Sequence, residues 1–283
     1  MTRRVDALLH DAASILSSQP TGNTARLDAE LLLCHVLDKP RSFLFTWPDH
    51  ELGDAQYDQF RDLLEQRRKG TPVAYLMGER DFWTLKLNVS PAVLIPRPDT
   101  ELLVELALAR ELPKNACVVD LGTGTGAIAL ALASEKPAWT VYAVDKFPDA
   151  LEVARNNASR NRIDTVQFLQ GSWCKPLPEG QLDMIVSNPP YIRSGDVHLD
   201  QGDVRFEPRT ALASGDDGLD DIRLITSQAR AKLKAGGWLL FEHGYDQGEA
   251  IRQLMLEAGF SDVSTMPDLA CHDRVSLGRK GTG

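Results

Sequence analysis

Cysteine is scarce in this sequence, and its positions argue against two classes of site. The four cysteines are scattered without a C-x-x-C pair, at Cys34, Cys117, Cys174 and Cys271. Such spacing favours neither a zinc cluster nor a disulfide framework. We therefore expect no metal site and a reducing compartment such as the cytoplasm.

Positive charge is also in short supply, because 31 lysines and arginines face 40 aspartates and glutamates and leave a net charge of −9. No broad basic surface is available to neutralise the phosphates of long DNA or RNA. No window reaches the roughly 18 apolar residues of a membrane helix, and the start, MTRRVDALLHDAASIL, is followed by no export cleavage site. We expect a soluble, cytoplasmic monomer with no stable nucleic acid and no membrane partner.

The first seventy residues show apolar side chains at helical spacing. These runs cover residues 5–16, 29–37 and 57–64, and turn-forming or polar segments at residues 20–23 and 39–53 separate them. The pattern predicts a small helical bundle over residues 1–71. The chain exceeds the usual length of one domain, so a second, larger domain is expected after it.

Aromatic and β-branched residues between Pro72 and Pro98 predict a hairpin connector, followed by a domain over residues 99–283. In that domain strand-like and helix-like segments alternate, which is typical of an α/β fold with a mostly parallel sheet. Strands are expected at residues 116–121, 140–145, 182–187, 238–242 and, as a final pair, within 262–278. Helices are expected at residues 127–134 and 219–233, from Pro148 onward, and in a segment that ends at 258.

A glycine-rich loop joins the first of these strands to the helix that follows. In VVDLGTGTGAIALAL the loop residues are Gly122, Thr123, Gly124, Thr125 and Gly126. Glycines allow a ligand to approach the main chain, and the N–H groups of the helix attract negative groups. Asp145 ends the next strand 23 residues after Gly122, which is the spacing of an acid that receives the hydroxyls of an adenosine ribose.

The spacing of these glycines indicates which nucleoside cofactor the loop suits. Dinucleotide sites carry G-x-G-x-x-G, whereas this chain has G-x-G-x-G preceded by Asp120. The loop with its strand-end acid resembles that of class I S-adenosylmethionine-dependent methyltransferases, which have a Rossmann-like fold. That resemblance implies S-adenosyl-L-methionine as cofactor and S-adenosyl-L-homocysteine as product. A glycine-rich turn without a ligand is the alternative.

The segment Asn188-Pro189-Pro190-Tyr191 follows a buried strand, at the edge where open α/β sheets bind ligands. The Asn188 side chain and the Pro189 carbonyl offer two acceptors for the hydrogens of a planar NH₂ group, and Tyr191 offers a flat face. An amide nitrogen is a weak nucleophile, so holding its hydrogens favours in-line methyl transfer without a general base. A proline-stiffened turn is the structural alternative.

These two motifs together resemble the amino-methylating methyltransferases, which act on adenine in DNA, guanine in RNA or glutamine in protein. The wider sequence is more specific: IPRPDTE, DLGTGTG, SNPPYI and FEPRTAL closely resemble the release factor glutamine methyltransferases, the PrmC/HemK family. The resemblance covers nearly the whole chain. It implies methylation of the glutamine in the Gly-Gly-Gln motif of bacterial class I peptide chain release factors, with the helical domain gripping the release factor.

The resemblance also assigns roles to particular residues. Asn188, Pro189, Pro190 and Tyr191 are expected to hold the glutamine amide as catalytic and substrate-binding residues. The loop Gly122 to Gly126, Asp145, Asn188 and Trp173 are expected to bind the cofactor, with Trp173 near the adenine. Ser172 stands where many methyltransferases have an acid, which weakens the expectation of a hydrogen bond to the adenine from that position.

For several other polar and aromatic residues, both a functional and a structural role are possible. Arg97, Asp99 and Glu101 could close the site or form a helix cap with salt bridges. Phe82 and Trp83 could line the glutamine pocket, although packing is the commoner role of such aromatics. A structural role is also favoured for the pair Glu242-His243. The loop residues His198, Asp203 and Arg205 are expected in a lid, with a solvated loop as the alternative, and the charged run 65–69 is expected to be a solvated helix end.

Overall fold

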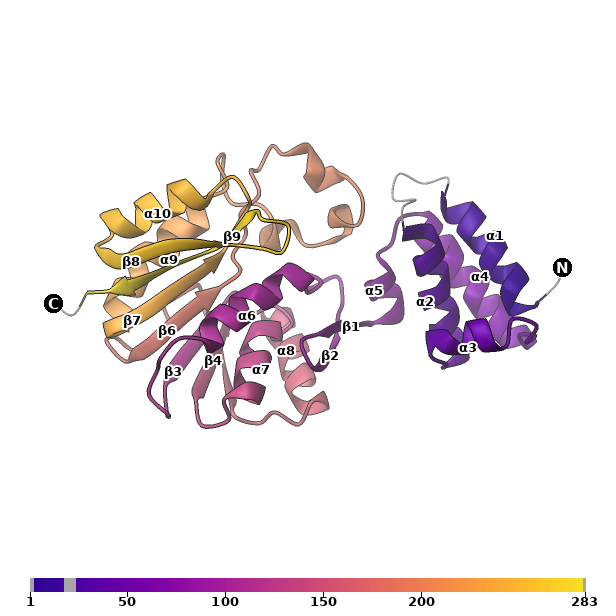
Figure 1. The fold of residues 1–283 in the computed structure, drawn as a ribbon, viewed down its shortest axis with the longest axis horizontal. Coiled ribbons are helices and arrows are strands. Elements are labelled where there is room, and N and C mark those ends of the chain that lie inside the picture. The colour runs from indigo at the N-terminus through magenta and orange to yellow at the C-terminus, as the bar shows by residue number, and fades with distance from the viewer. Residues whose placement is uncertain (1–2, 18–23, 282–283) are drawn as a thin grey trace. The chain divides into compact units, whose positions relative to one another are not determined.

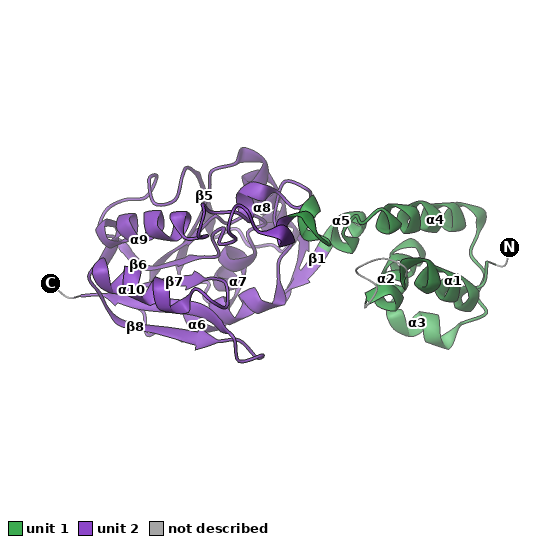
Figure 2. Cartoon of the chain, turned by 90° about the horizontal axis from the view of Figure 1, so that it is seen from above, with its two compact units in different colours: residues 1–79, 200–206 green, residues 80–199, 207–283 purple. Residues whose placement is uncertain are grey.

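A computed structural model of the chain describes residues 3–17 and 24–281 (Figure 1). The predicted separator at residues 20–23 lies outside these ranges. The chain divides into two compact units. One consists of Met1–Glu79 and Asp200–Phe206, and the other consists of Arg80–Leu199 and Glu207–Gly283 (Figure 2). The predicted boundaries after residues 71 and 98 bracket the division after Glu79.

The first unit is built from helices whose apolar faces meet. They are α1 (Val5–Ser17), α2 (Ala25–Leu37), α3 (Arg41–Thr46), α4 (Asp54–Arg68) and α5 (Val73–Met77). Val5, Leu8 and Ala12 of α1 are buried in one cluster with Leu32 and Phe60, as the spacing of three and four residues requires. The short helices α3 and α5 were not expected, because six or fewer residues display no helical period.

One prediction for this unit is wrong. The charged run at residues 65–69 was expected to be solvated, yet the side chain of Arg67 is only 4% exposed. Its Nε donates to Asp28 at 2.7 Å, and one terminal nitrogen donates to Asp203 at 2.7 Å. Arg67 therefore joins the segment 200–206 to the helices of its own unit, while its neighbours Arg68 and Lys69 remain exposed.

The second unit begins with the predicted hairpin and continues as an α/β domain. The hairpin pairs β1 (Glu79–Phe82) with β2 (Leu85–Asn88). The main sheet contains β3 (Cys117–Leu121), β4 (Thr140–Asp145), β5 (Val166–Gln170), β6 (Leu182–Ser187), β7 (Leu233–Glu242), β8 (Phe260–Pro267) and β9 (Asp273–Lys280). Their order is β5-β4-β3-β6-β7-β9-β8. The first five are parallel, whereas β9 runs antiparallel to both β7 and β8.

Helices cover both faces of this sheet (Figure 1). They are α6 (Glu101–Leu108), α7 (Ala127–Glu135), α8 (Pro148–Arg160), α9 (Asp220–Lys232) and α10 (Gly248–Glu257). Alternate residues of β3 serve the two faces: Val118 packs in the cluster with α6, α7 and α8, and Val119 and Leu121 pack with α9 and α10. The mostly parallel α/β fold is therefore confirmed.

The strand order places a crevice at the carboxyl ends of β3 and β6. From β3 the chain winds outward through β4 to β5, and it then returns to add β6 and β7 on the other side. Ligands of open α/β sheets bind where the winding reverses in this way. The glycine loop after β3 and the segment after β6 both lie at that crevice. No helix within residues 3–17 and 24–281 has the length and apolar character needed to cross a membrane.

Candidate active site

The glycine loop adopts backbone angles that suit glycine. Gly122, Gly124 and Gly126 have φ values of 71°, 52° and 84°, in the left-handed region that side chains rarely adopt. A Cβ at Gly122 would lie 3.1 Å from the ring of Trp173, whereas a Cβ at Gly124 would meet no atom within 4 Å. The loop therefore packs against Trp173 at one glycine and leaves open space at the other.

Asp145 ends β4 and is held against this loop. Its Oδ2 accepts a hydrogen bond from the Gly124 N–H at 2.9 Å, and its Oδ1 accepts one from the Phe147 N–H at 3.0 Å. Burial raises the pKa of this carboxyl, although these backbone hydrogen bonds oppose the change. Each oxygen keeps a second lone pair, so the carboxylate can still accept hydrogen bonds from a ligand.

Asp120, the acid before the loop, is fully buried beneath it. Its Oδ2 accepts hydrogen bonds from the Thr123 hydroxyl at 2.6 Å and from the Ala129 N–H at 3.2 Å. Its Oδ1 has no hydrogen-bond partner among the described residues. Burial raises the pKa of Asp120 to about 7. The side chain of Thr123 thus supports the loop from below.

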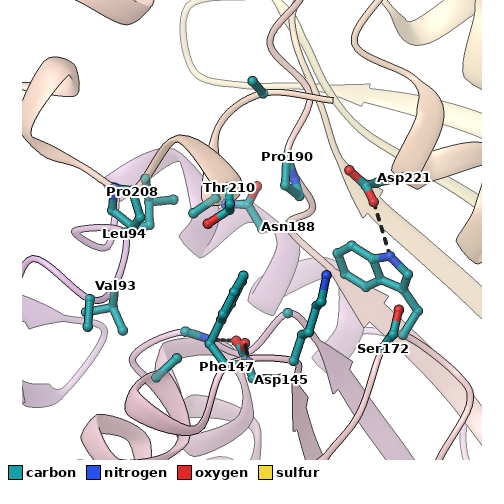
Figure 3. A pocket seen from close by; sticks show the side chains of 18 of the residues that line it. Val93, Leu94, Asp145, Phe147, Ser172, Asn188, Pro190, Pro208, Thr210 and Asp221 are labelled. Atoms are coloured by element: carbon teal, nitrogen blue, oxygen red, sulfur yellow. Dashed lines mark hydrogen bonds between the residues drawn. The ribbon is translucent and has the colours of Figure 1, made fainter. Parts of the chain in front are cut away.

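A cavity of about 420 Å³ opens beside the loop and contains several of the predicted site residues. Asp145 projects into it from the end of β4, and Asn188 and Pro190 project into it from the segment after β6 (Figure 3). The predicted residues that line it are Gly122, Gly124, Asp145, Trp173, Asn188 and Pro190, and Ser172 lines it as well. Thr123, Thr125, Gly126, Pro189 and Tyr191 are close in sequence but do not line it. Phe82 and Trp83 do not line it either.

Asp221 is a cavity residue that the sequence analysis missed. Its Oδ1 accepts a hydrogen bond from the Trp173 indole at 3.1 Å, and its Oδ2 accepts one from the Ser214 hydroxyl at 2.7 Å. These contacts fix the indole beside Gly122 and hold a carboxylate at the wall of the cavity that Ser172 also lines. Only its place in the first turn of α9 could have drawn attention to it.

Three long-range hydrogen bonds hold the segment after β6. The Asn188 side-chain nitrogen donates to the Thr100 hydroxyl oxygen at 3.2 Å. The Tyr191 hydroxyl lies 3.5 Å from Oε1 of Glu242, and the Tyr191 main-chain oxygen accepts from the side chain of Gln247 at 2.9 Å. The segment is therefore fixed by side chains that are distant in sequence.

Glu242 ends β7 and is only 1% exposed. Burial raises the pKa of Glu242 to about 7, while a hydrogen bond with Thr100 and the charge of Arg274 partly offset that increase. Its Oε2 finds no hydrogen-bond partner within the described part of the chain. The sequence analysis noticed Glu242 but could not place it beside Tyr191 and Thr100.

The IPRPDTE residues make salt bridges and hydrogen bonds. Arg97 pairs with Glu207 and Asp99 lies 3.9 Å from Arg274, while Glu101 accepts a hydrogen bond from the Trp83 N–H at 2.9 Å. Neither Arg97 nor Thr100 makes a side-chain cap. The salt bridges expected for a structural role of this segment are therefore observed, whereas the expected helix cap is not.

The remaining candidates also have structural partners. Phe82 is buried in the core, and the Trp83 indole donates to Glu135 at 2.8 Å. His243 lies 2.8 Å from the Ser276 hydroxyl, and His198 lies 2.7 Å from Asp196. Arg205 donates to the Lys69 carbonyl at 3.0 Å. Across residues 3–17 and 24–281, no three His, Cys, Asp or Glu side chains are grouped to hold a metal ion.

Comparison with known families gives two matches along the chain. Residues 7–78 match the model of the PrmC N-terminal domain, and residues 98–206 match that of the methyltransferase small domain. Among solved structures, a methyltransferase from Pyrococcus furiosus has a TM-score of 0.54 at 20% identity and covers 70% of this chain and 90% of its own. That likeness supports the class I fold.

Curated relatives are similar over the full length. The release factor glutamine methyltransferase of Vibrio cholerae is 52% identical over 283 residues, which is 100% of this chain and 99% of that protein. The Escherichia coli protein of the same name is 51% identical over 271 residues, which is 95% of this chain and 98% of its own length. The chain therefore belongs to the release factor glutamine methyltransferase family, within the S-adenosylmethionine-dependent methyltransferases.

Proposed function

We propose that this chain transfers a methyl group from S-adenosylmethionine to the side-chain amide nitrogen of the glutamine in the Gly-Gly-Gln motif of bacterial peptide chain release factors. The reaction would take place in the bacterial cytoplasm. One observation carries the proposal: Asn188, the first residue of NPPY, lines the same cavity as Gly122, Gly124 and Asp145. Residues of the proposed substrate-holding motif and of the proposed cofactor loop thus line one cavity, which supports the proposal.

The residues that line the cavity fit the cofactor. Gly124 leaves open space where a side chain would otherwise stand, and Gly122 allows the Trp173 ring to approach the main chain. Asp145 retains acceptor capacity for the ribose hydroxyls, and the Trp173 ring offers a flat surface for the adenine. When bound, S-adenosylmethionine supplies an electrophilic methyl group on a sulfonium. We infer that these residues hold and orient it.

The substrate amide needs orientation rather than deprotonation. The Asn188 carbonyl oxygen would accept one amide hydrogen and the Pro189 main-chain carbonyl the other, so that the nitrogen lone pair points along the line of transfer. Acceptors placed at these hydrogens also stabilise the positive charge that develops on the nitrogen. The N–CH₃ bond would form as the S–CH₃ bond breaks and S-adenosyl-L-homocysteine leaves. The methylated nitrogen would then lose one of its hydrogens to water, so no general base is assigned.

A direct assay tests this proposal. The protein is incubated with methyl-labelled S-adenosylmethionine and a release factor, or with DNA or RNA, and mass spectrometry locates the label. We expect label on the Gly-Gly-Gln glutamine. Label on nucleic acid and none on glutamine would instead favour the amino-methyltransferases that act on DNA or RNA. Cofactor binding without transfer to any of them would indicate a non-catalytic module.

Matched asparagine variants extend the assay. Asn188→Ala should abolish transfer and keep part of the cofactor binding, because it removes the proposed amide acceptor and leaves the glycine loop intact. Asn115 is exposed and does not line the cavity, so Asn115→Ala should behave like the unaltered protein. Full activity in Asn188→Ala would contradict the amide contact.

A further inference from the structure

Asp221, in the first turn of α9, connects two parts of the cavity wall that lie far apart in the sequence. Its Oδ1 accepts a hydrogen bond from the indole of Trp173, a cavity residue that follows β5. Its Oδ2 accepts one from the hydroxyl of Ser214, which directly follows the cavity residue Ala213. One carboxylate therefore holds a side chain from each of two segments.

The backbone of Trp173 shows that the place of its ring is enforced by its surroundings. Its φ is 52°, in the left-handed region that residues other than glycine seldom adopt and that persists only where other contacts fix it. The indole N–H donates to Asp221 at 3.1 Å (Figure 3), and the N–H of Cys174 donates to the side chain of Gln228 at 3.1 Å. Two residues of α9 thus keep the Trp173 ring against Gly122.

Ser214 extends this connection to the segment that contains the NPPY motif. Its hydroxyl donates to Asp221 at 2.7 Å and accepts from the Asp221 N–H at 2.8 Å, so two hydrogen bonds join the pair. The Ser214 N–H donates to the Ile192 carbonyl at 2.9 Å. The Leu212 carbonyl accepts from the N–H groups of Tyr191 and Ile192 at 3.1 and 2.9 Å. The end of NPPY is therefore paired with the segment that ends at Ser214.

We propose that Asp221 and Ser214 are positioning residues that hold the Trp173 ring and the NPPY segment at a fixed separation, so that S-adenosylmethionine and the substrate amide are aligned. This inference rests on the proposed function, in which Trp173 contacts the cofactor and NPPY holds the amide. Such alignment matters for methyl transfer, because a displacement of about 1 Å can cost about a hundredfold in rate. Ser214 does not line the cavity, so it acts through its neighbours.

The two donors predict which side chains can replace Asp221. An indole N–H only donates, whereas a hydroxyl can donate or accept. Asparagine can accept from Trp173 through its oxygen and donate to Ser214 through its nitrogen, and alanine can do neither. Asp221→Ala should therefore lower the affinity for S-adenosylhomocysteine about tenfold and kcat with a release factor at least about tenfold, whereas Asp221→Asn should keep most of both. Equal losses in the two variants would overturn the inference.

Asp220→Ala is the matched control for these variants. Asp220 is exposed, lies in the same first turn of α9 and does not line the cavity. The substitution removes one negative charge together with a 3.2 Å ion pair to Arg223, and it should change affinity and kcat by less than about twofold. Losses equal to those of Asp221→Ala would mean that charge at the start of the helix explains the effect, and would overturn the positioning role.

Ser214→Ala separates the two connections. It removes the hydroxyl that joins Asp221 to the NPPY side and leaves the hydrogen bond between Asp221 and Trp173 in place. We expect kcat with a release factor to fall about tenfold, while the affinity for S-adenosylhomocysteine changes by less than about threefold. Unchanged kcat in Ser214→Ala would overturn the inference, and so would a tenfold loss of cofactor affinity.

A double substitution distinguishes positioning through Trp173 from direct contact of Asp221 with the ligand. Trp173→Phe keeps an aromatic ring and removes the N–H donor. Adding Asp221→Ala to Trp173→Phe should lower the affinity for S-adenosylhomocysteine by a further factor of no more than about two, because the interaction between the two side chains is already lost. A further loss of about tenfold would assign Asp221 to the ligand itself and overturn its positioning role.

A readout without ligand separates this inference from the proposed function. In nitrogen-15 NMR spectra, the Trp173 indole is identified as the signal lost in Trp173→Phe. Its N–H should exchange with solvent at least about tenfold faster in Asp221→Ala than in the unaltered protein or in Asp220→Ala. Equal exchange would refute the positioning role. Failure to methylate any release factor, with the changes in exchange and in S-adenosylhomocysteine affinity present, would refute the proposed function alone.

Discussion

Arg97 donates a hydrogen bond to the carboxylate of Glu207, which lies 110 positions later in the chain and has a fully buried side chain. The other oxygen of Glu207 accepts from the Ile95 N–H at 3.3 Å. Leu94 and Pro208, the sequence neighbours of these residues, both line the cavity. The pair therefore joins the IPRPDTE and FEPRTAL segments and braces two walls of the candidate site.

Breaking this pair should cost stability and cofactor affinity together. Arg97→Met removes a charge-assisted hydrogen bond from the buried Glu207 carboxylate, which we expect to lower the free energy of unfolding by about 2–3 kcal/mol. Urea unfolding and calorimetric titration with S-adenosylmethionine measure the two effects. Arg223→Met removes an exposed pair with Asp217 and should cost under about 1 kcal/mol. Equal losses in both variants would argue against a bracing role.

Alanine substitutions in the glycine loop can distinguish the effect of backbone strain on stability from the effect of an added side chain on cofactor binding. Alanine at Gly122, where φ is 71°, should cost about 1–2 kcal/mol of stability from the left-handed backbone. It also meets the Trp173 ring at 3.1 Å, so cofactor affinity should fall more than about tenfold as the wall of the site shifts. Thermal unfolding and calorimetric titration give both values.

Two further glycines serve as controls for that variant. Gly124 and Gly180 have φ values of 52° and 63°, and a Cβ at either position meets no atom within 4 Å. Of these two glycines, Gly124 lines the cavity and Gly180 does not. Gly124→Ala should therefore weaken cofactor binding, while Gly180→Ala should lose stability alone. Weakened binding in Gly180→Ala would show that strain, and not contact, explains the effect.

The helical unit depends on a buried arginine. Arg67→Met leaves Asp28, a buried carboxylate, without its cation, and should destabilise this unit by about 3–5 kcal/mol. Arg68→Met removes the neighbouring exposed pair with Glu65 and should cost under about 1 kcal/mol. Hydrogen exchange of α2 and α4 reports on this unit by itself. Faster exchange in Arg68→Met than in Arg67→Met would show that Arg68, and not Arg67, stabilises this unit.

The parts of the fold that the sequence predicted are those governed by local pattern. β4 and β6 were expected at the residues they occupy, because central parallel strands are buried on both faces and appear as continuous apolar runs. β5 was missed because it lies at the sheet edge, and its polar residues Gln167 and Gln170 interrupt the run.

The parts of the site that escaped prediction depend on contacts between distant residues. The glycine loop and Asp145 are visible in the sequence because one strand, one loop and the next strand bring them together. Thr100 meets Asn188 across 88 positions, and Glu242 meets Tyr191 across 51. These contacts follow from the order and register of the strands, which no local motif encodes. The burial of Arg67 also depends on a distant contact, because its partner Asp203 lies 136 positions away.

The buried carboxyl of Asp120 should make stability depend on pH. Its pKa is raised to about 7 in the folded chain, compared with about 4 for an unfolded aspartate. The folded state therefore binds more protons between these values, and the free energy of unfolding should decrease as pH rises from about 4 to about 7. Above about pH 7 the carboxyl is ionised in both states, so it causes no further decrease in the free energy of unfolding.

Asp120→Asn removes this dependence and keeps the shape of the side chain. The asparagine oxygen can accept the bonds from Thr123 and Ala129, and its NH₂ group replaces an oxygen that has no partner among the described residues. The gain in melting temperature over the unaltered protein should be large at pH 8 and small at pH 5, because Asp120 is already neutral in the folded state at pH 5. Asp149→Asn, at an exposed position in the first turn of α8, controls for the loss of one charge. An equal gain at both pH values would mean that Asp120 is not neutralised by burial.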